Sequence, residues 1–287
     1  MENTNKVAVC CMAGGYKNAF TQGVLTAFEE NGLTADVYTA CSSSTLIAAF
    51  AAFKGIRQLN LALWENGYTI SQEDGGDQSR AMLHSIQQLS SKIKSNLWEP
   101  SSSRLVIATS HIITNDAATA AQSEGAKRLG QMLLLNAMRH KTEWKDNNLE
   151  SELFGTYLDG RTRLLTKENF NEVAYATTRM LHAWKIPACI EGRAYIDGSY
   201  TSHFPTKFLT ELKCGRIICI SVEKEKVFTN IFMQKEIPFQ IDGVLVDVIK
   251  PDIDLKELGL DFYKITEDGL NIGYKHGYEK GLTYMNK

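Results

Sequence analysis

The 287-residue sequence lacks several features that define common functional classes. Its 31 Lys and Arg residues against 33 Asp and Glu residues give a net charge of −2, which argues against an electrostatic nucleic-acid binder. No apolar run approaches the length that spans a bilayer, and the N-terminal segment lacks the basic and apolar regions of a Sec signal. We therefore expect no nucleic-acid partner, no signal peptide and no transmembrane helix, in a protein that is cytoplasmic or peripheral at a membrane. A secreted effector exported without a cleaved signal is the alternative.

Motifs for metals and nucleotides are also absent. The sequence has 6 cysteines, but no pair has the C-x-x-C spacing of a zinc or redox site, and most lie in apolar runs typical of reduced core residues. A glycine loop follows the first expected strand, without the G-x-G-x-x-G spacing of a dinucleotide site or the G-K-[ST] of a P-loop. We therefore expect no metal and no cofactor, and a nucleotide site ranks below the other interpretations.

The N-terminal part of the sequence predicts a parallel sheet covered by helices. A short apolar strand at 6–12 ends in the loop Ala13-Gly14-Gly15, and a helix is expected at 17–31. A second strand at 36–40 and a second helix at 43–54 complete a βαβ-type opening.

The rest of the sequence continues the α/β pattern, and its length and composition favour a single domain over residues 1–287. Further strands are expected at 105–112, 172–177, 216–222 and 244–249. Further helices are expected at 80–96, 117–139 and 270–285, and loops at 71–79 and 99–103.

The stretch from Val37 to Phe50, V-Y-T-A-C-S-S-S-T-L-I-A-A-F, reads as a buried strand that turns through small residues into an apolar helix. A nucleophile elbow places its serine at such a bend, where the hydroxyl is exposed and the following helix N-terminus favours developing negative charge. Ser42 occupies the central position of the small-x-Ser-x-small pattern, with Ala40 and Ser44 where glycine is usual. A run of serines before a helix is more often an N-cap, and we expect Ser43 and Ser44 to cap the helix.

A serine nucleophile needs an adjacent base, and none of the 6 histidines lies in a recognisable catalytic motif. Asp252 or Asp254 with His276 could supply the acid and base of an α/β-hydrolase. In that fold several strands precede the elbow, whereas only one does here.

A better candidate for the base is Asp197. Gly192 reads as a hairpin turn, and Tyr195-Ile196 reads as a strand that ends at Asp197-Gly198. Taken alone, an Asp before a Gly at a strand end is usually plain turn chemistry.

Together these segments resemble the patatin-like phospholipase family. The matching blocks, in order, are A-G-G-Y-K (13–17), A-C-S-S-S (40–44), D-G-S (197–199) and the flanking prolines of W-K-I-P (184–187) and H-F-P (203–205). The helix G-V-L-T-A-F-E-E-N-G-L (23–33) and the strand I-I-C-I-S-V (217–222) are similar to family elements as well. The resemblance covers about residues 6–55 and 172–223.

The resemblance implies a three-layer α/β/α fold with a central, mostly parallel sheet. It also implies a serine acyl-hydrolase that cleaves carboxylic ester bonds of lipids, of the phospholipase A or lysophospholipase type. Ser42 would attack the acyl carbonyl, and Asp197 would accept its proton without a histidine, so that an acyl-enzyme forms and water hydrolyses it. The backbone amides of Gly14, Gly15 and Tyr16 would form the oxyanion hole.

One match and several departures qualify this comparison. Lys17 matches the family's basic residue, which would hold the loop or favour anionic intermediates or head groups; a solvated lysine is the alternative. Ala13, Ala40, Ser44 and Ser199 each replace a residue that is usually glycine or, at the last position, glycine or alanine. At a position requiring positive φ, such a replacement would cost about 1 kcal/mol and could reshape the elbow or weaken activity.

Three other functions stay open: an acyltransferase or a thioesterase using the same dyad, or a catalytically weak lipid-binding protein on the same scaffold. Expected partners are a lipid or acyl-ester substrate and a transient membrane surface, contacted through mobile apolar loops or through another protein. Among the apolar residues near the motifs, most are expected in the core and only those from Met180 to Trp184 to touch substrate. These residues are Leu46, Ile47, Phe50, Phe53, Met180, Leu181 and Trp184.

Overall fold

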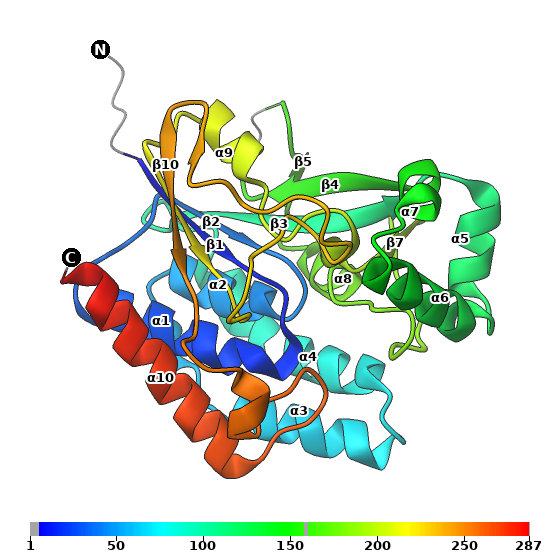
Figure 1. The fold of residues 1–287 in the computed structure, drawn as a ribbon, viewed down its shortest axis with the longest axis horizontal. Coiled ribbons are helices and arrows are strands. Elements are labelled where there is room, and N and C mark those ends of the chain that lie inside the picture. The colour runs from blue at the N-terminus through cyan, green and yellow to red at the C-terminus, as the bar shows by residue number, and fades with distance from the viewer. Residues whose placement is uncertain (1–5, 158–159, 287) are drawn as a thin grey trace.

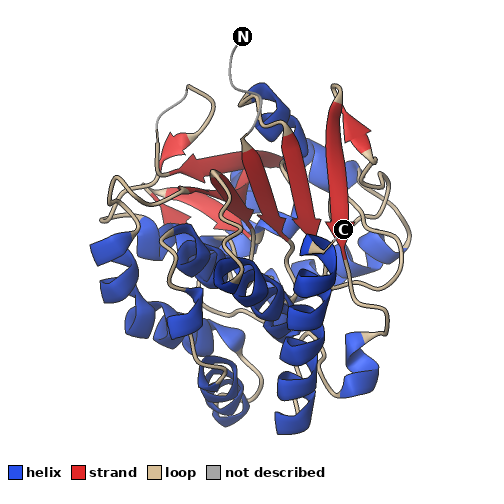
Figure 2. Cartoon of the chain, turned by 90° about the vertical axis from the view of Figure 1, so that its left-hand side faces the viewer, coloured by secondary structure: helices blue, strands red, loops and turns tan. Residues whose placement is uncertain are grey.

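The computed structural model describes residues 6–157 and 160–286. The strands are β1 (Val7–Cys11), β2 (Val37–Ala40), β3 (Arg104–Ile112), β4 (Leu149–Gly155), β5 (Arg163–Leu164), β6 (Cys189–Ile190), β7 (Arg193–Ile196), β8 (Arg216–Ile220), β9 (Gln240–Ile241) and β10 (Val244–Ile249). Their order in the sheet is β5-β4-β3-β2-β1-β8-β10-β9, and β7 pairs with β3 and β6 beside this path. The sheet is mostly parallel and flanked by helices, consistent with a three-layer α/β/α fold (Figures 1 and 2).

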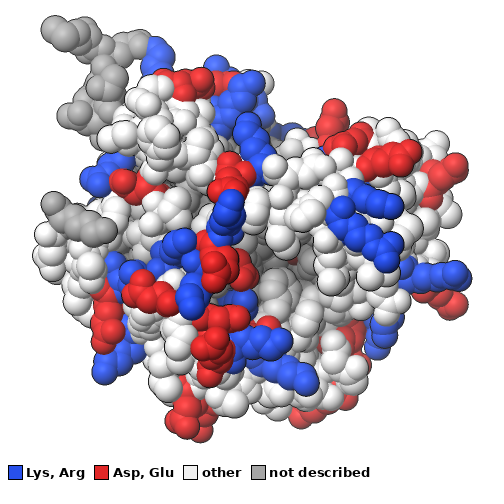
Figure 3. Space-filling view, viewed as in Figure 1, with Lys and Arg blue, Asp and Glu red and all other residues white. Residues whose placement is uncertain are grey.

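The helices join these strands and cover the sheet. They are α1 (Asn18–Glu30), α2 (Ser44–Ala52), α3 (Ala62–Glu73), α4 (Gln78–Asn96), α5 (Asn115–Gln122), α6 (Ala126–Met138), α7 (Glu143–Asn148), α8 (Phe170–Ala176), α9 (Thr206–Glu211) and α10 (Glu267–Met285). Short 3₁₀ turns are η1 (Gly15–Lys17), η2 (Ile56–Gln58), η3 (Gly198–Tyr200) and η4 (Leu255–Leu258). None of the helices among the described residues has the length and apolar character needed to cross a membrane. Basic and acidic side chains are interspersed on the face shown in Figure 3.

The sheet brings the predicted motifs together at one edge. Strands β1, β2 and β8 are parallel neighbours, with Cys11 opposite both Ala40 and Ile220. Their following loops therefore leave the sheet side by side, at the carboxyl ends where open α/β sheets bind ligands. Strand β7 runs antiparallel to β3, with Ile196 opposite Ser110, so the chain after β7 returns toward the elbow.

The strand expected at 172–177 is wrong, because residues 172–176 belong to α8 and Thr177 is its C-cap. The backbone N–H of Thr166 donates to Asn169 Oδ1 (2.8 Å), and the Asn169 N–H donates to Thr166 Oγ1 (3.2 Å). This reciprocal pair starts the helix in the manner of a capping box. The apolar run that follows is too short for its periodicity to distinguish a buried strand from a helix.

Other expected boundaries also shift. The helix expected at 117–139 is two helices, α5 and α6, separated at 123–125 by a turn containing Gly125. The loop expected at 71–79 is short, because α3 continues to Glu73 and α4 begins at Gln78. Helix α3 and strand β4 were not predicted at all, whereas the loop at 99–103 is confirmed.

Helix α10 packs on α1 through close backbone contacts, which the sequence reading also missed. A Cβ on Gly23 of α1 would lie 2.0 Å from Tyr274 O, and a Cβ on Gly277 of α10 would lie 2.0 Å from Phe20 O. Each glycine therefore admits the backbone of the opposite helix. The spacing of Gly269, Gly273, Gly277 and Gly281 places them on one face of α10.

Candidate active site

Ser42 lies at the bend between β2 and α2 with a backbone φ of 59°, and no other residue from Ala40 to Ser44 has positive φ. The left-handed conformation is strained for serine and is the geometry of a nucleophile elbow. The Ser42 N–H donates to Thr177 Oγ1 (2.9 Å), and that hydroxyl donates to Ala108 O (2.6 Å). Residues from the end of α8 and from β3 thus fix the bend.

The elbow positions that usually hold glycine do not require it here. Neither Ala40 nor Ser44 has positive φ, so the expected backbone penalty does not arise. The Ser44 hydroxyl is 2.9 Å from Cys11 O and accepts a hydrogen bond from the Cys41 N–H (3.2 Å), which ties the elbow to β1.

The predicted capping role of Ser43 and Ser44 is wrong. Ser43 is the N-cap residue of α2, but its side chain makes no capping hydrogen bond. The Ser43 hydroxyl instead donates to Gly15 O (3.1 Å) and accepts from Asn18 Nδ2 (2.8 Å). This hydroxyl bonds to the glycine loop rather than to the helix, because β1 and β2 end side by side at the same edge of the sheet.

Asp197 follows β7 and is completely buried. Its Oδ1 accepts a hydrogen bond from the Ser199 N–H (2.8 Å), whereas Oδ2 has no hydrogen-bond partner among the described residues. Burial raises the pKa of this carboxyl to about 6, while the nearby Ser199 and Ser42 hydroxyls and the Ser199 N–H act in the opposite direction. Its backbone is also held, because the Asp197 N–H donates to Arg179 O and its carbonyl accepts from Ser110 Oγ.

The structure therefore brings Ser42 and Asp197 within reach of each other. No Ser42–Asp197 hydrogen bond of normal distance and angle is formed, although the Ser42 hydroxyl is close enough to lower the pKa of the carboxyl. Such bonds are often long in unliganded enzymes and tighten with substrate. Gly198 permits this approach, because a Cβ there would lie 2.1 Å from Ala108 O and 3.0 Å from Cys41 Cβ.

The glycine loop supplies backbone donors beside Ser42. In the described part of the chain, the N–H groups of Gly14 and Gly15 make no hydrogen bond, but the Tyr16 N–H donates to Phe262 O (3.4 Å). The predicted donor at Tyr16 is thus occupied. The Ser43 N–H also has no partner among the described residues, and it follows the serine directly, where elbows usually provide an oxyanion donor. The sequence reading missed this donor.

Lys17 is buried rather than solvated. Its Nζ lies 3.1 Å from Glu223 Oε1 and 4.0 Å from Asp254 Oδ1. The ion pair joins the glycine loop to the segment after β8, and Lys17 does not line the pocket at Ser42. Of the roles expected for this residue, the contacts favour holding the loop.

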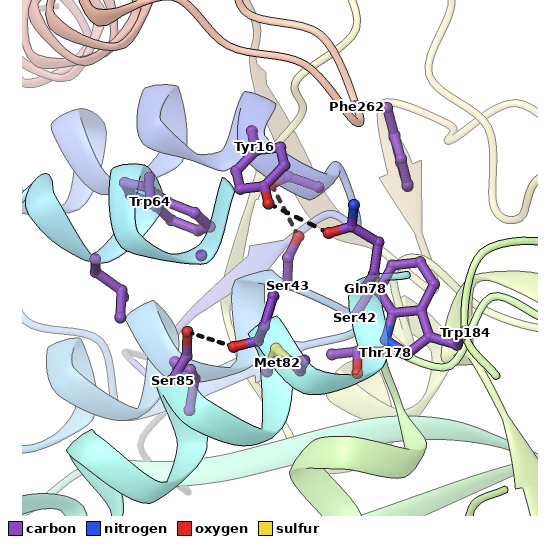
Figure 4. A pocket seen from close by; sticks show the side chains of 15 residues that line it. Tyr16, Ser42, Ser43, Trp64, Gln78, Met82, Ser85, Thr178, Trp184 and Phe262 are labelled. Atoms are coloured by element: carbon purple, nitrogen blue, oxygen red, sulfur yellow. Dashed lines mark hydrogen bonds between the residues drawn. The ribbon is translucent and has the colours of Figure 1, made fainter. Parts of the chain in front are cut away.

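A narrow pocket opens beside Ser42, with a volume of about 60 Å³ (Figure 4). This is about four to six times the 10–15 Å³ that one water needs on the same measure. The lining is mostly apolar. It comprises Gly15, Tyr16, Ser42, Ser43, Leu46, Leu63, Trp64, Gly67, Gln78, Ala81, Met82, Ser85, Thr178, Trp184 and Phe262.

Of the apolar candidates near the motifs, Leu46 and Trp184 line this pocket. Met180 lines an adjoining pocket of about 460 Å³, which also reaches Ala13, Ser199 and Phe262. Phe262 thus stands between the two pockets. The remaining candidates, Ile47, Phe50, Phe53 and Leu181, pack into or against the hydrophobic core.

No histidine lines the pocket at Ser42 among the described residues. His276 accepts a hydrogen bond from the Asp252 N–H (3.2 Å) and packs on Phe20, on the α10 side of the fold. His203 lies beside Cys41, and burial lowers its pKa to about 3. The described residues also contain no group of three or more His, Cys, Asp or Glu side chains that could hold a metal.

The sequence matches no protein-family model, and no curated protein matches it.

Proposed function

We propose that this protein is a serine acyl-hydrolase of the patatin-like type, which cleaves carboxylic ester bonds of lipids as a phospholipase A or lysophospholipase. The observation that carries the proposal is the pairing of a strained, left-handed Ser42 with the buried Asp197, whose Oδ2 has no partner among the described residues. A strained serine and an incompletely bonded buried carboxylate are both costly, and such features cluster at functional sites.

The proposed reaction begins when Asp197 accepts the proton of the Ser42 hydroxyl and Oγ attacks the ester carbonyl carbon. The oxyanion that forms accepts hydrogen bonds from free backbone N–H groups, of which Gly15 and Ser43 line the pocket. The C–O bond then breaks, and the proton passes from Asp197 to the departing alcohol. Water attacks the acyl-enzyme by the same steps, with Asp197 as base, and releases the carboxylic acid.

The pKa of Asp197 suits this role. At about 6, it leaves the carboxyl mostly ionised at pH 7 and raises its basicity above that of an ordinary aspartate. The mostly apolar pocket favours an acyl group, and a transient membrane surface is the source of substrate that we propose.

Among the alternatives, a non-catalytic lipid-binding protein was suggested by the missing elbow glycines. The missing glycines are a weaker argument for that alternative in the structure, because neither Ala40 nor Ser44 has positive φ. Acyl transfer and thioester hydrolysis would use the same residues and differ only in the acceptor or the leaving group.

The test is covalent labelling with a fluorophosphonate, combined with assays of short- and long-chain acyl esters. We expect labelling of the wild type, loss of labelling in Ser42→Ala, and a fall in kcat of at least about 1,000-fold in Ser42→Ala and Asp197→Asn. Ser85→Ala is the matched control, because it removes another pocket hydroxyl, which donates to Ala81 O, outside the elbow and the glycine loop. Absence of labelling in the wild type, or activity that survives both substitutions, would overturn the proposal.

A further inference from the structure

The Trp184 side chain is a buried hydrogen-bond donor without a protein acceptor. It is only 8% exposed, and its Nε1 has no hydrogen-bond partner among the described residues. The residue lines the pocket at Ser42, and Figure 4 shows the nitrogen-bearing edge of the indole facing Ser42 and Thr178. Indole nitrogen can only donate, and a buried Trp N–H usually finds a partner.

Apart from Ser42, each of the other polar side chains that line this pocket has a hydrogen-bond partner among the described residues. Tyr16 Oη donates to Gln78 Oε1, and Gln78 Nε2 donates to Ser71 Oγ. The remaining hydroxyls donate to backbone carbonyls. These are Ser43 to Gly15 O, Ser85 to Ala81 O and Thr178 to Tyr175 O.

Trp64 offers a direct contrast within the same pocket. It is equally buried at 8% exposure, but its Nε1 donates to Gln22 Oε1 (2.7 Å). A buried N–H without a protein acceptor is therefore not a general property of tryptophans here.

We propose that the pocket selects an acyl group that carries a hydrogen-bond acceptor oxygen, such as a keto or ether oxygen, and that Trp184 Nε1–H binds this oxygen. The inference rests on the proposed acyl-hydrolase function and deepens it. The apolar walls of the pocket suit an acyl chain, and the indole N–H is an unpaired donor beside the nucleophile. This donor is already buried and unpaired before substrate binds, so only a substrate that carries the oxygen gains this hydrogen bond.

The first test compares p-nitrophenyl hexanoate with its 4-oxo and 5-oxo derivatives in wild type and Trp184→Phe. Trp184→Phe removes the N–H but keeps an aromatic ring. We expect it to lower the oxo-to-plain ratio of kcat/KM by about 5- to 10-fold for at least one oxo position, the effect of one neutral hydrogen bond. Comparing the ratio between variants cancels the intrinsic reactivity of each ester.

Trp64→Phe is the matched control and should leave that ratio unchanged. An unchanged ratio in Trp184→Phe, or an equal fall in both variants, would overturn the inference.

The second test does not require activity and so separates this inference from the proposed function. The sequence has 4 tryptophans, so ¹⁵N-labelled Ser42→Ala protein gives few indole N–H signals, and that of Trp184 is identified by its loss in Trp184→Phe. Methyl 4-oxohexanoate or methyl 5-oxohexanoate should shift this signal downfield, and methyl hexanoate should not. No shift, or the same shift with the plain ester, would overturn the inference even if fluorophosphonate labels the enzyme. Failure of labelling in the wild type would instead overturn the proposed function.

Discussion

The α1–α10 interface and the nucleophile elbow use small residues in opposite ways. At the interface, glycine is required because backbone meets backbone, as at Gly23 and Gly277. At the elbow, two positions that usually hold glycine are filled by Ala40 and Ser44 without any positive φ. The strained conformation belongs to Ser42 alone.

The interface glycines stabilise the fold, whereas residues of the candidate site lower its stability. Close packing of α1 on α10 stabilises the fold, so replacing the interface glycines with larger residues should lower the free energy of unfolding. The site holds a left-handed serine and a buried carboxyl whose pKa is raised to about 6, both of which are unfavourable for folding. Substitutions should therefore destabilise the first region and, at the carboxyl, stabilise the second.

The largest effect is expected from Gly277→Ala in the interface. The added Cβ would lie 2.0 Å from Phe20 O, so α10 must move away from α1. We expect a loss of about 3 kcal/mol or more in the free energy of unfolding, at the upper end for overpacking against rigid backbone. Urea denaturation followed by circular dichroism measures this loss.

Gly32→Ala is the control for that measurement. Its φ is 79°, but no atom lies within 4 Å of the added Cβ, so only the backbone cost of about 1 kcal/mol is expected. Equal losses in the two variants would mean that α1 and α10 adjust freely, and the contrast with the elbow would fail.

The comparison also shows what the sequence could predict. The first strand, the glycine loop, the elbow and the hairpin turn at Gly192 could be located, because each has a local signature. Parallel neighbouring strands must also end at one edge of the sheet. Convergence of Ser42 and Asp197 was expected only because direct proton transfer requires hydrogen-bond reach. The antiparallel pairing of β7 with β3, which brings Asp197 toward the elbow, was not predicted. The helix at 170–176 could not be distinguished from a strand by its apolar pattern, although Thr166 and Asn169 carried a capping signal.

Features that depend on long-range packing were beyond the sequence. Phe262, in the segment before α10, contacts the glycine loop, and its carbonyl accepts a hydrogen bond from the Tyr16 N–H. The unpartnered N–H of Trp184 depends on which groups surround it in space. The regular glycines of α10 were visible as a spacing, but only the structure shows that Gly277 and Gly281 face α1, whereas Gly269 and Gly273 contact the segment 258–260.

A smaller effect, of opposite sign, is expected from Asp197→Asn. The wild-type carboxyl has a pKa of about 6 in the folded protein against about 3.9 in the unfolded chain, so the native state binds the proton more tightly. Proton binding by Asp197 therefore stabilises the folded protein fully below about pH 4, and this stabilisation is lost as pH rises through 6. Asparagine removes the buried charge and keeps Oδ1 as acceptor for Ser199, so we expect a gain of about 2 kcal/mol at pH 7.

That gain should shrink as pH falls from 7 toward 4, which denaturation at several pH values measures. The same titration should reduce wild-type esterase activity below about pH 6, because protonated Asp197 cannot accept the Ser42 proton. A loss of stability in Asp197→Asn that is the same at every pH would contradict the assignment of unfavourable burial to the site.

The smallest effect is expected from Ala40→Gly, which restores the glycine usual in such elbows. Ala40 is buried and has no positive φ, so glycine relieves no strain there and only loses a methyl contact and gains freedom in the unfolded chain. We expect a destabilisation of about 1 kcal/mol and a kcat/KM for p-nitrophenyl esters within about 2-fold of wild type. A several-fold increase in kcat/KM would show that alanine restrains the elbow, and Ser42 would then not carry the strain of the bend alone.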